Sequence, residues 1–432
     1  MESLFDRPKQ GERAVLVHID FSSNKGSRED PDEFEMLVDS AGAECTSILR
    51  GSRQKPDARF FIGSGKAREL AQQVEEDEAD LVIFNHILSP SQERNLEQEL
   101  KCRVLDRTGL ILDIFAQRAR TFEGKLQVEL AQLEHLSTRL IRGWTHLERQ
   151  KGGIGLRGPG ETQLETDRRL LRARIKAIHK RLDKVRKQRD QGRRSRKKAE
   201  VPTVSLVGYT NAGKSTLFNH LTTSEVFVAD QLFATLDPTL RRLDVEDVGA
   251  VIMADTVGFI RDLPHKLVEA FRATLEESKE ADLLLHVVDA CAEERAENIF
   301  HVNEVLREIK ADSVPVLMVY NKIDLMGDVK PRIDFDDEGV PQAVWMSAKT
   351  GVGTDLFFEA LSLRVGRKLV DGTVCLTPAM GQLRSLFHQL GVVNEESYDE
   401  IGNTVLDIRL PEKEFQQALK KTNLTALQIG FE

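Results

Sequence analysis

The chain has 432 residues, of which 40% are hydrophobic and 30% charged, and its formal net charge is −9. At roughly 150 residues per domain this length suggests about three domains, and the composition argues against disorder throughout. Apolar runs such as 81–84 and 283–288 are far shorter than the roughly 18 residues that a membrane-spanning helix needs. Four dispersed cysteines without a CxxC pair, and an N-terminus without a signal-like stretch, predict a cytoplasmic protein with no membrane span.

The charge is distributed unevenly. Between Arg139 and Lys198 there are 21 Lys or Arg against 6 Asp or Glu, a local charge of +15 that leaves −24 for the rest of the chain. One concentrated basic limb in an acidic chain favours contact with a localised polyanion. A solvated helix face followed by a linker is the alternative interpretation.

Residues 1–122 alternate short apolar runs with helix-like stretches. This alternation is typical of a small open α/β domain with a mainly parallel sheet. The expected strands are 14–19, 60–62, 81–84 and 104–105, and the expected helices include 32–41, 66–76 and 91–100.

Residues 123–200 change to a helical period. Apolar side chains recur at steps of three and four from Leu126 to Leu147, and again from Leu164 to Val185. Two such stripes can pack against each other as a long antiparallel helical hairpin, with residues 191–200 as a charged linker. The connection KGGIGLRGPGE can bring backbone close to another surface, and a merely flexible tip is the alternative. The expected RNA contacts in it are Lys151, Gly152, Gly153, Gly155, Arg157 and Gly158.

Residues 201–370 return to strands alternating with helices. Nearly continuous apolar strands of this kind predict a doubly wound, mainly parallel sheet. Residues 371–432 are expected to form a small C-terminal α/β unit, with a strand at 404–410 and a helix at 412–421. The strands expected in the larger sheet are 203–207, 251–254, 283–288, 316–320 and 344–346.

A phosphate-binding loop follows the first strand of that sheet, because GYTNAGKS matches the pattern GxxxxGKS between a strand and a helix. Its glycines let successive amides turn toward phosphate oxygens, and the following helix adds the positive end of its dipole. Lys214 supplies a charge to the β and γ phosphates, and Ser215 offers a hydroxyl to Mg²⁺. The expected contacts are Gly208, Tyr209, Thr210, Asn211, Ala212, Gly213, Lys214, Ser215 and Thr216.

The base is selected by the sequence NKID, which follows the strand 316–320. The Asp324 carboxylate can accept from both N1–H and the 2-amino group of guanine, whereas adenine offers neither donor, so we expect GTP as the substrate. Asn321 is expected to brace this loop and Lys322 to cover the base. The expected contacts are Asn321, Lys322, Ile323 and Asp324, with Ser347, Ala348 and Lys349 closing the other side.

Two further segments are expected to sense the γ-phosphate. In DTVG, Asp255 can hold the water shell of Mg²⁺ and Gly258 can bring its amide to the γ-phosphate. In FATLD, Thr235 would complete the magnesium site only while the γ-phosphate is present. Thr239 is the rival for that role, and Thr235 is preferred because Thr239 leads into the next strand.

The expected site residues fall into three roles: hydrolysis, magnesium binding and nucleotide contact. Lys214, Thr235 and Gly258 are expected to act in hydrolysis, and Ser215 and Thr235 to bind magnesium. Further nucleotide contacts are expected at Phe233, Ala234, Thr235, Leu236, Asp237, Asp255, Thr256, Val257 and Gly258.

The ordered elements GxxxxGKS, switch threonine, DxxG, NKxD and SAK resemble the translation-factor-related class of GTP-binding domains. The basic hairpin reading GGIGLRGPGETQLETDRR, followed by GYTNAGKSTLFN and FATLDPT, resembles more particularly the HflX family of ribosome-associated GTPases. The resemblance covers nearly the whole chain, with less support beyond Val370. It implies GTP-dependent binding to the large ribosomal subunit and splitting of stalled ribosomes, notably under heat stress.

The resemblance also implies ribosomal RNA contacts by the N-terminal domain and hairpin, which agrees with the basic charge found there. We expect no DNA partner, a monomer, and a cytoplasmic location, with peripheral attachment to a membrane left open. Phe259 stands where Ras-like enzymes have a water-orienting glutamine, so we expect slow intrinsic hydrolysis that ribosomal particles stimulate.

Two alternatives stay open. The sequence FFIGSGK at 60–66 hints at a second phosphate site, with ATP use in the N-terminal domain, although it lacks the full loop spacing and a tight strand-to-helix turn is the default. The second functional alternative is a nucleotide-regulated RNA-binding or RNA-remodelling protein acting on ribosomal RNA.

Overall fold

The chain forms two compact units, Met1–Leu243 with Ala250–Phe357, and Asp244–Gly249 with Phe358–Glu432. Among the described residues, no helix has the length and apolar character required to cross a bilayer. The computed structural model describes residues 11–21, 31–143, 163–198, 201–222, 232–233, 235–246, 248–261, 272–366, 369–399, 401–422 and 424–430.

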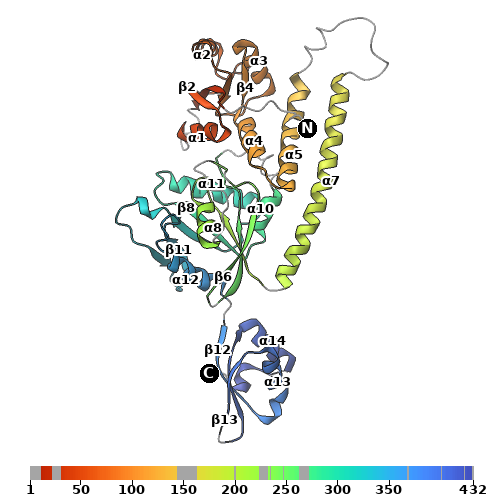
Figure 1. Ribbon diagram of the computed structural model, residues 1–432, viewed down its shortest axis with the longest axis vertical. Coiled ribbons are helices and arrows are strands. Elements are labelled where there is room, and N and C mark those ends of the chain that lie inside the picture. Colours follow the sequence, from red (N-terminus) through yellow and green to blue (C-terminus); the bar gives the residue numbers. More distant parts are fainter. Residues whose placement is uncertain are drawn as a thin grey trace. The chain divides into compact units, whose positions relative to one another are not determined.

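The first unit begins with a four-stranded, wholly parallel sheet in the order β2-β1-β3-β4 (Figure 1). This confirms the small α/β layer structure expected from the sequence. Its strands are β1 (Arg13–Phe21), β2 (Glu44–Arg53), β3 (Leu81–Phe84) and β4 (Arg103–Leu105).

Helices cover both faces of this sheet because the side chains of β1 alternate between two cores. Leu16 joins a buried cluster with residues of α1 and α4, whereas Val15 and Val17 join another with residues of α2 and α3. The helices are α1 (Pro31–Ala41), α2 (Ser64–Glu76), α3 (Pro90–Leu100) and α4 (Arg107–Arg118).

One strand in this region was wrongly predicted. Residues 60–62 form a tight turn, in which Phe61 has a φ of 64° and pairs with Asp57, and α2 begins directly after it. The second strand is instead β2, whose side chains are mostly half-buried or exposed. Because an edge strand of this kind lacks a continuous apolar run, its sequence carries little strand signal.

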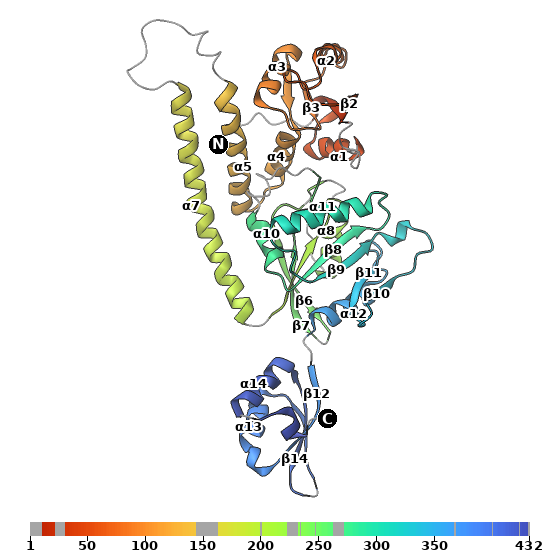
Figure 2. The same cartoon turned by 180° about the vertical axis from the view of Figure 1, so that it is seen from behind.

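The predicted helical hairpin is confirmed by α5 (Phe122–Gly143) and α7 (Gln163–Lys198), which lie side by side in Figures 1 and 2. Leu126, Leu130 and Leu133 of α5 pack on Ile178 of α7. The linker predicted from residue 191 is wrong, because α7 continues to Lys198. Arginine, lysine and glutamine are good helix formers, and no proline interrupts them.

The predicted doubly wound, mainly parallel sheet is also confirmed, in the order β10-β11-β9-β8-β5-β7-β6. The pairs linking β7, β5, β8, β9 and β11 are parallel, and β10 adds an antiparallel edge. The strands are β5 (Thr203–Val207), β6 (Thr239–Val245), β7 (Gly249–Asp255), β8 (Leu283–Asp289), β9 (Val316–Asn321), β10 (Arg332–Phe335) and β11 (Pro341–Trp345). The helices of this region are α8 (Lys214–Thr222), α10 (Arg272–Lys279), α11 (Arg295–Glu308) and α12 (Thr354–Val365).

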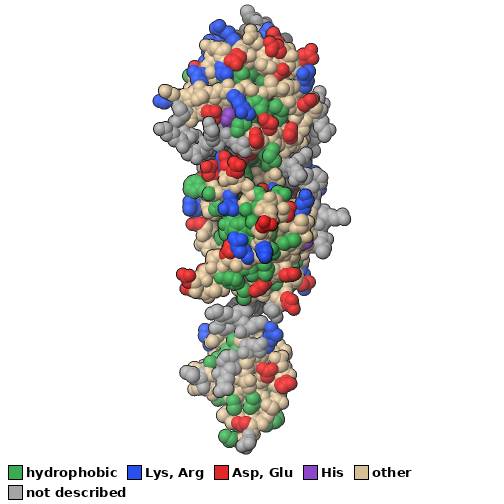
Figure 3. Space-filling model, turned by 90° about the vertical axis from the view of Figure 1, so that its left-hand side faces the viewer, with side chains coloured by type: hydrophobic (Ala, Val, Ile, Leu, Met, Phe, Trp, Pro, Cys, Tyr) green, Lys and Arg blue, Asp and Glu red, His purple; other side chains and the backbone are tan. Residues whose placement is uncertain are grey.

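Parallel strands bring their carboxyl ends to one edge, so the loops after β5, β7 and β9 meet there. On the face of the first unit seen in Figure 3, acidic and basic side chains are interspersed with hydrophobic ones.

The second unit contains a three-stranded antiparallel sheet in the order β12-β14-β13. Phe387 and Phe415 stack at a centroid distance of 6.3 Å and bring α13 and α14 onto a core that includes Leu406. Its elements are β12 (Leu369–Leu376), α13 (Gly381–Leu390), β13 (Val393–Tyr398), β14 (Thr404–Pro411) and α14 (Glu412–Thr422).

Candidate functional site

The loop after β5 has the shape expected of a phosphate cradle. Gly208 has a φ of 148°, and a Cβ there would lie 2.2 Å from the Val287 carbonyl oxygen. Gly213 has a φ of 89°, and a Cβ there would lie 2.3 Å from Asn321 Nδ2. Both positions therefore require glycine, because L side chains rarely adopt positive φ and neither site has room for one.

Lys214, the first residue of α8, is buried, and its Nζ donates to the Tyr209 carbonyl at 2.8 Å. Burial lowers the pKa of Lys214 to about 8, against the attraction of Asp255. A buried ammonium that donates to a backbone carbonyl of the loop can exchange that partner for phosphate oxygens. Nucleotide phosphates would supply the negative charge that stabilises the protonated lysine.

Ser215, Thr235 and Asp255 meet in one cluster. Ser215 Oγ lies 2.7 Å from Thr235 Oγ1, and both hydroxyls donate to Asp255 Oδ2, at 2.9 Å and 3.0 Å. Asp255 is fully buried, which raises the pKa of its carboxyl against the opposing charge of Lys214. The other oxygen, Oδ1, has no hydrogen-bond partner within the described part of the chain. Two hydroxyls and a buried carboxylate with one unsatisfied oxygen form a hard oxygen donor set that fits Mg²⁺.

Thr235 and Thr239 are the two candidates for the switch threonine, and they lie in different places. Thr235 reaches both Ser215 and Asp255, whereas Thr239 is the first residue of β6. The structure therefore brings Thr235, and not Thr239, to the predicted magnesium ligands.

Gly258 lies against the phosphate loop. A Cβ on this residue would be 2.9 Å from Lys214 Nζ and 3.0 Å from the Thr210 Cα. The next residue, Phe259, is 1% exposed. Its backbone N–H donates to the Gly208 carbonyl at 3.1 Å and its carbonyl accepts from the Thr210 N–H at 2.7 Å. The ring is thus part of the core and cannot orient a water molecule.

The loops predicted to hold the base meet through Asn321, whose Oδ1 accepts from the Ala348 N–H. Lys322 has a φ of 68° and its Nζ lies 2.8 Å from Asp289, so its stem is held across the loop. Asp324 is exposed, leaving its carboxylate accessible to a base. Ser347 is buried and its Oγ accepts from the Thr350 N–H at 3.2 Å, which shapes the loop that carries Ala348 and Lys349.

Other predicted contacts have partners away from the phosphate cradle. The Tyr209 phenol donates to Glu33 of α1 and accepts from the Arg261 N–H at 3.0 Å. Phe233 and Asp237 contact α4 and the start of α5 instead of the hydroxyl cluster. Thr256 Oγ1 donates to the Leu206 carbonyl at 2.6 Å. The predicted residues outside the described part of the chain are Ala234, Lys151, Gly152, Gly153, Gly155, Arg157 and Gly158.

Sequence reasoning missed the contacts of Arg107, in the N-terminal domain, with its own domain and with the segment that follows Gly258. Arg107 Nη2 donates to Glu33 at 2.7 Å and to the Arg261 carbonyl at 3.2 Å, and its Nη1 donates to Asn85 at 2.5 Å. These residues share no motif, and they come together only through tertiary packing. No local signal in the sequence could have identified them.

The fold and the site define the chain as a P-loop GTPase. Three family models match consecutive parts of it: "GTP-binding GTPase N-terminal" at residues 28–116, "GTP-binding GTPase Middle Region" at 118–196, and "50S ribosome-binding GTPase" at 203–322.

The chain is 60% identical to the GTPase HflX of Escherichia coli (strain K12) over 418 residues, which cover 97% of this chain and 98% of that protein. The GTPase HflX of Magnetococcus marinus is 47% identical over 379 residues, 87% of each chain. A crystal structure of SsGBP in complex with GDP is 26% identical, covers 81% of this chain and 97% of its own, and has a TM-score of 0.47.

The chain belongs to the HflX family. It is therefore a ribosome-binding GTPase that binds and hydrolyses GTP.

Proposed function

We propose that this protein is a GTP-driven switch that binds the large ribosomal subunit and splits stalled or idle ribosomes into subunits. The observation that supports it most is that one loop carries both Thr235, which meets Ser215 and Asp255, and Asp237, which contacts the start of the hairpin helix α5. A role under heat stress is part of the same proposal and rests on the family resemblance.

The chain's residues divide the work of hydrolysis. Lys214 binds the β and γ phosphates, the Gly258 N–H binds the γ-phosphate, and Asp324 selects guanine. Ser215 and Thr235 would hold Mg²⁺ directly, with Asp255 holding its water shell. The bound ion would neutralise charge on the phosphate oxygens and favour phosphoryl transfer. Phe259 closes the site against the core, so intrinsic hydrolysis is slow and a group ordered on the ribosome positions the water.

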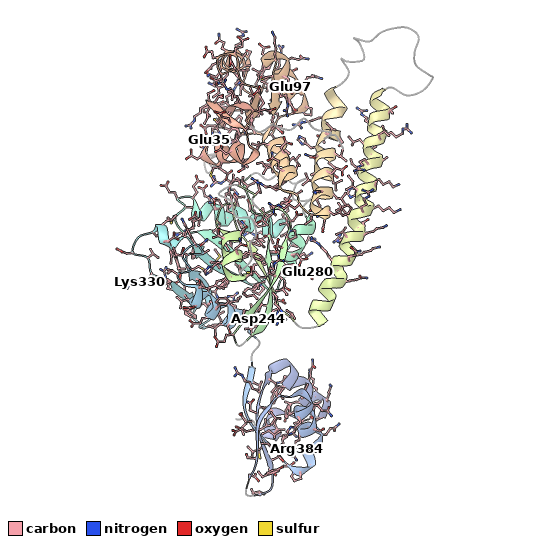
Figure 4. All side chains as sticks on the ribbon, viewed as in Figure 1. Glu35, Glu97, Asp244, Glu280, Lys330 and Arg384 are labelled. Atoms are coloured by element: carbon pink, nitrogen blue, oxygen red, sulfur yellow. The ribbon has the colours of Figure 1, made fainter. Side chains whose placement is uncertain are left out.

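The helix α7 supports ribosomal RNA as the contact of the hairpin. Nitrogen-tipped side chains project from its outer side in Figure 4. Dense positive charge on one helix binds a polyanion by releasing counterions. The exposed basic residues of α7 are Arg169, Arg172, Lys176, Lys180, Arg181, Lys184, Arg186 and Lys187.

Light scattering of intact ribosomes tests the splitting activity. We expect the signal to fall when the protein is added with GTP and to stay constant with GDP. Unwinding of a free RNA duplex by the protein, with ribosomes left intact, would instead support an RNA-remodelling function.

A salt titration of subunit binding tests the role of α7. Replacing Arg172, Lys176 and Lys180 together by glutamine should weaken binding and reduce the slope of log affinity against log salt by about 2 to 3, since each lost phosphate contact removes about 0.7 to 0.9. The matched control replaces Lys279, Lys310 and Lys330, which are exposed on the GTP-binding domain. An equal effect of both triple variants would contradict a specific role of α7.

The glycine-rich loop is tested separately. Replacing Gly155 and Gly158 by alanine should impair ribosome splitting and leave GTP affinity within about twofold, because the substitutions lie outside the nucleotide-binding motifs. Full splitting activity in this variant would rule out the proposed role of the loop.

A further inference from the structure

Asp237, two residues after Thr235, binds Thr121, the N-cap residue of the hairpin helix α5, and the side chains of Asp237 and Thr121 together are called the cap. Its Oδ2 accepts from the backbone N–H groups of Arg120 and Thr121, at 2.8 Å and 2.9 Å. Its Oδ1 accepts from Thr121 Oγ1 at 2.5 Å, and that hydroxyl oxygen accepts from the Gly124 N–H at 2.9 Å. The Thr121 hydroxyl satisfies a donor of the first helical turn, and the Asp237 carboxylate, from 116 residues away in the sequence, orients that hydroxyl.

The first turn of α5 is shaped to receive this carboxylate. A Cβ on Gly124 would lie 2.0 Å from Asp237 Oδ1 and 2.9 Å from its Cγ. Gly124 has no positive φ that would require glycine, and alanine is favoured over glycine within a helix. The glycine therefore serves the close approach of Asp237 and not the helix itself.

The other end of the same loop is fixed to the N-terminal domain. The Leu232 N–H donates to Ser40 Oγ of α1 at 2.9 Å. The ring of Phe233 packs edge-on against Phe115 of α4, with centroids 4.7 Å apart. Thr235 is thus held between two attachments, one on each side of it in the sequence.

Thr235 is also the residue of this loop that contacts the predicted magnesium ligands Ser215 and Asp255. Two residues of extended chain span only about 7 Å. A large movement of Thr235 away from Ser215 therefore displaces Asp237 or breaks its bonds to Arg120 and Thr121. Conversely, a movement of the start of α5 pulls on Thr235, because coupling between two sites is reciprocal.

We propose that Asp237 is a positioning residue: by capping α5 it holds Thr235 at the phosphate site and couples the state of the nucleotide to the base of the hairpin. This proposal rests on the proposed function, in which the hairpin contacts the large subunit. Displacement of α5 on the subunit releases the cap and with it Thr235. Loss of the γ-phosphate frees Thr235 and weakens the cap.

Two variants remove the cap in different ways. Asp237→Ala deletes the acceptor, and Gly124→Ala expels it while favouring the helix. The matched controls are Asp336→Ala, which also removes a carboxylate that accepts from two backbone N–H groups, at 3.0 Å and 2.8 Å, and Gly381→Ala, at the start of a helix with open space around it.

The first readout is the ratio of affinities for guanylyl imidodiphosphate and GDP, measured by calorimetry with Mg²⁺. Both cap variants should weaken the triphosphate analogue by about 5- to 30-fold, the range of a helix-cap loss, and GDP by less than about twofold. The controls should leave both affinities unchanged. Equal weakening of both nucleotides would show a merely structural cap and overturn the proposal.

The second readout is hydrogen exchange of the amides of residues 120–124 in the full chain. In the wild type we expect slower exchange with guanylyl imidodiphosphate than with GDP, and in Asp237→Ala fast exchange with both. Equal exchange of the wild type in the two states would contradict the coupling. Both measurements are made without ribosomes. They can therefore contradict this coupling without contradicting ribosome splitting, and the light-scattering experiment can do the reverse.

Discussion

Asn321 joins the phosphate-binding loop to the base-binding loops by its contact with Ala212. Its Nδ2 donates to the Ala212 carbonyl at 3.0 Å, and its Oδ1 accepts from the Ala348 N–H at 2.8 Å. The side chain is 2% exposed, so water cannot replace either bond. One amide group therefore fixes the distance between the loop expected to bind phosphates and the loops expected to bind guanine.

Asn321→Ala should weaken GDP and a GTP analogue equally, by about 30-fold or more, because two buried groups lose their partner at about 1–3 kcal/mol each. Isothermal titration calorimetry measures both affinities. The control is Asn95→Ala, which removes a side-chain bond to the Arg59 carbonyl far from the nucleotide motifs. Unchanged nucleotide affinity in Asn321→Ala would contradict the bracing role.

Asp324→Asn should change the base preference of the site from guanine to xanthine. The amide offers a donor where the carboxylate accepts, so we expect GTP affinity to fall by about 100-fold or more and xanthosine triphosphate to bind instead. Fluorescent nucleotide competition measures the preference. Asp328→Asn, an exposed aspartate close by in the sequence, is the control and should keep the preference for GTP. The assignment fails if the Asp324 variant still prefers GTP.

Phe259→Gln should not create a fast GTPase. The ring is 1% exposed, so glutamine would be buried among apolar side chains and should lower the free energy of unfolding by about 3 kcal/mol. Single-turnover hydrolysis and urea unfolding check both expectations. A tenfold faster intrinsic rate with unchanged stability would mean that this position faces the attacking water.

The motifs predicted the nucleotide site because a phosphate loop, a magnesium carboxylate and a guanine-binding aspartate each depend on local sequence. Thr235 was identified from its place before a strand, and its partner Asp255 from its place after one. The contacts of Asp237 with Thr121, and of Glu33 with Tyr209, were not predictable. They are long-range pairs of ordinary polar residues, and only the packing of the N-terminal domain brings them together.

In the N-terminal domain the buried strands β1 and β3 were predictable from continuous apolar runs, whereas β2 was not. Its pairing with β1, from Arg13 with Glu44 to Phe21 with Arg53, satisfies the backbone without demanding apolar side chains. Helix α7 is longer than predicted, because a run of charged residues is typical of linkers and is also compatible with a helix.

The stability of the first unit should fall in acid because of His86. Burial, followed by the nearby His18, lowers the pKa of His86 to about 4. Between pH 6.5 and 4 the unfolded chain binds a proton on His86 and the folded chain does not. The free energy of unfolding therefore decreases as the pH falls through this window, by about 3 kcal/mol at its lower end. Above pH 6.5 this residue contributes no pH dependence. Urea unfolding at a series of pH values measures the effect.

His86→Gln should flatten the dependence between pH 6.5 and 4, because glutamine does not titrate there. The exposed histidine His388 of the second unit provides the control, and His388→Gln should leave the slope for the first unit unchanged. A steep slope that persists in His86→Gln would assign the acid sensitivity to other groups.

The central claim, a guanine-nucleotide switch that binds the large ribosomal subunit, is tested most directly by cosedimentation of the full chain with purified large subunits. We expect it to pellet with guanylyl imidodiphosphate, and to remain in the supernatant with GDP or adenylyl imidodiphosphate. Equal pelleting with all three nucleotides, or none with the guanine analogue, would contradict the account.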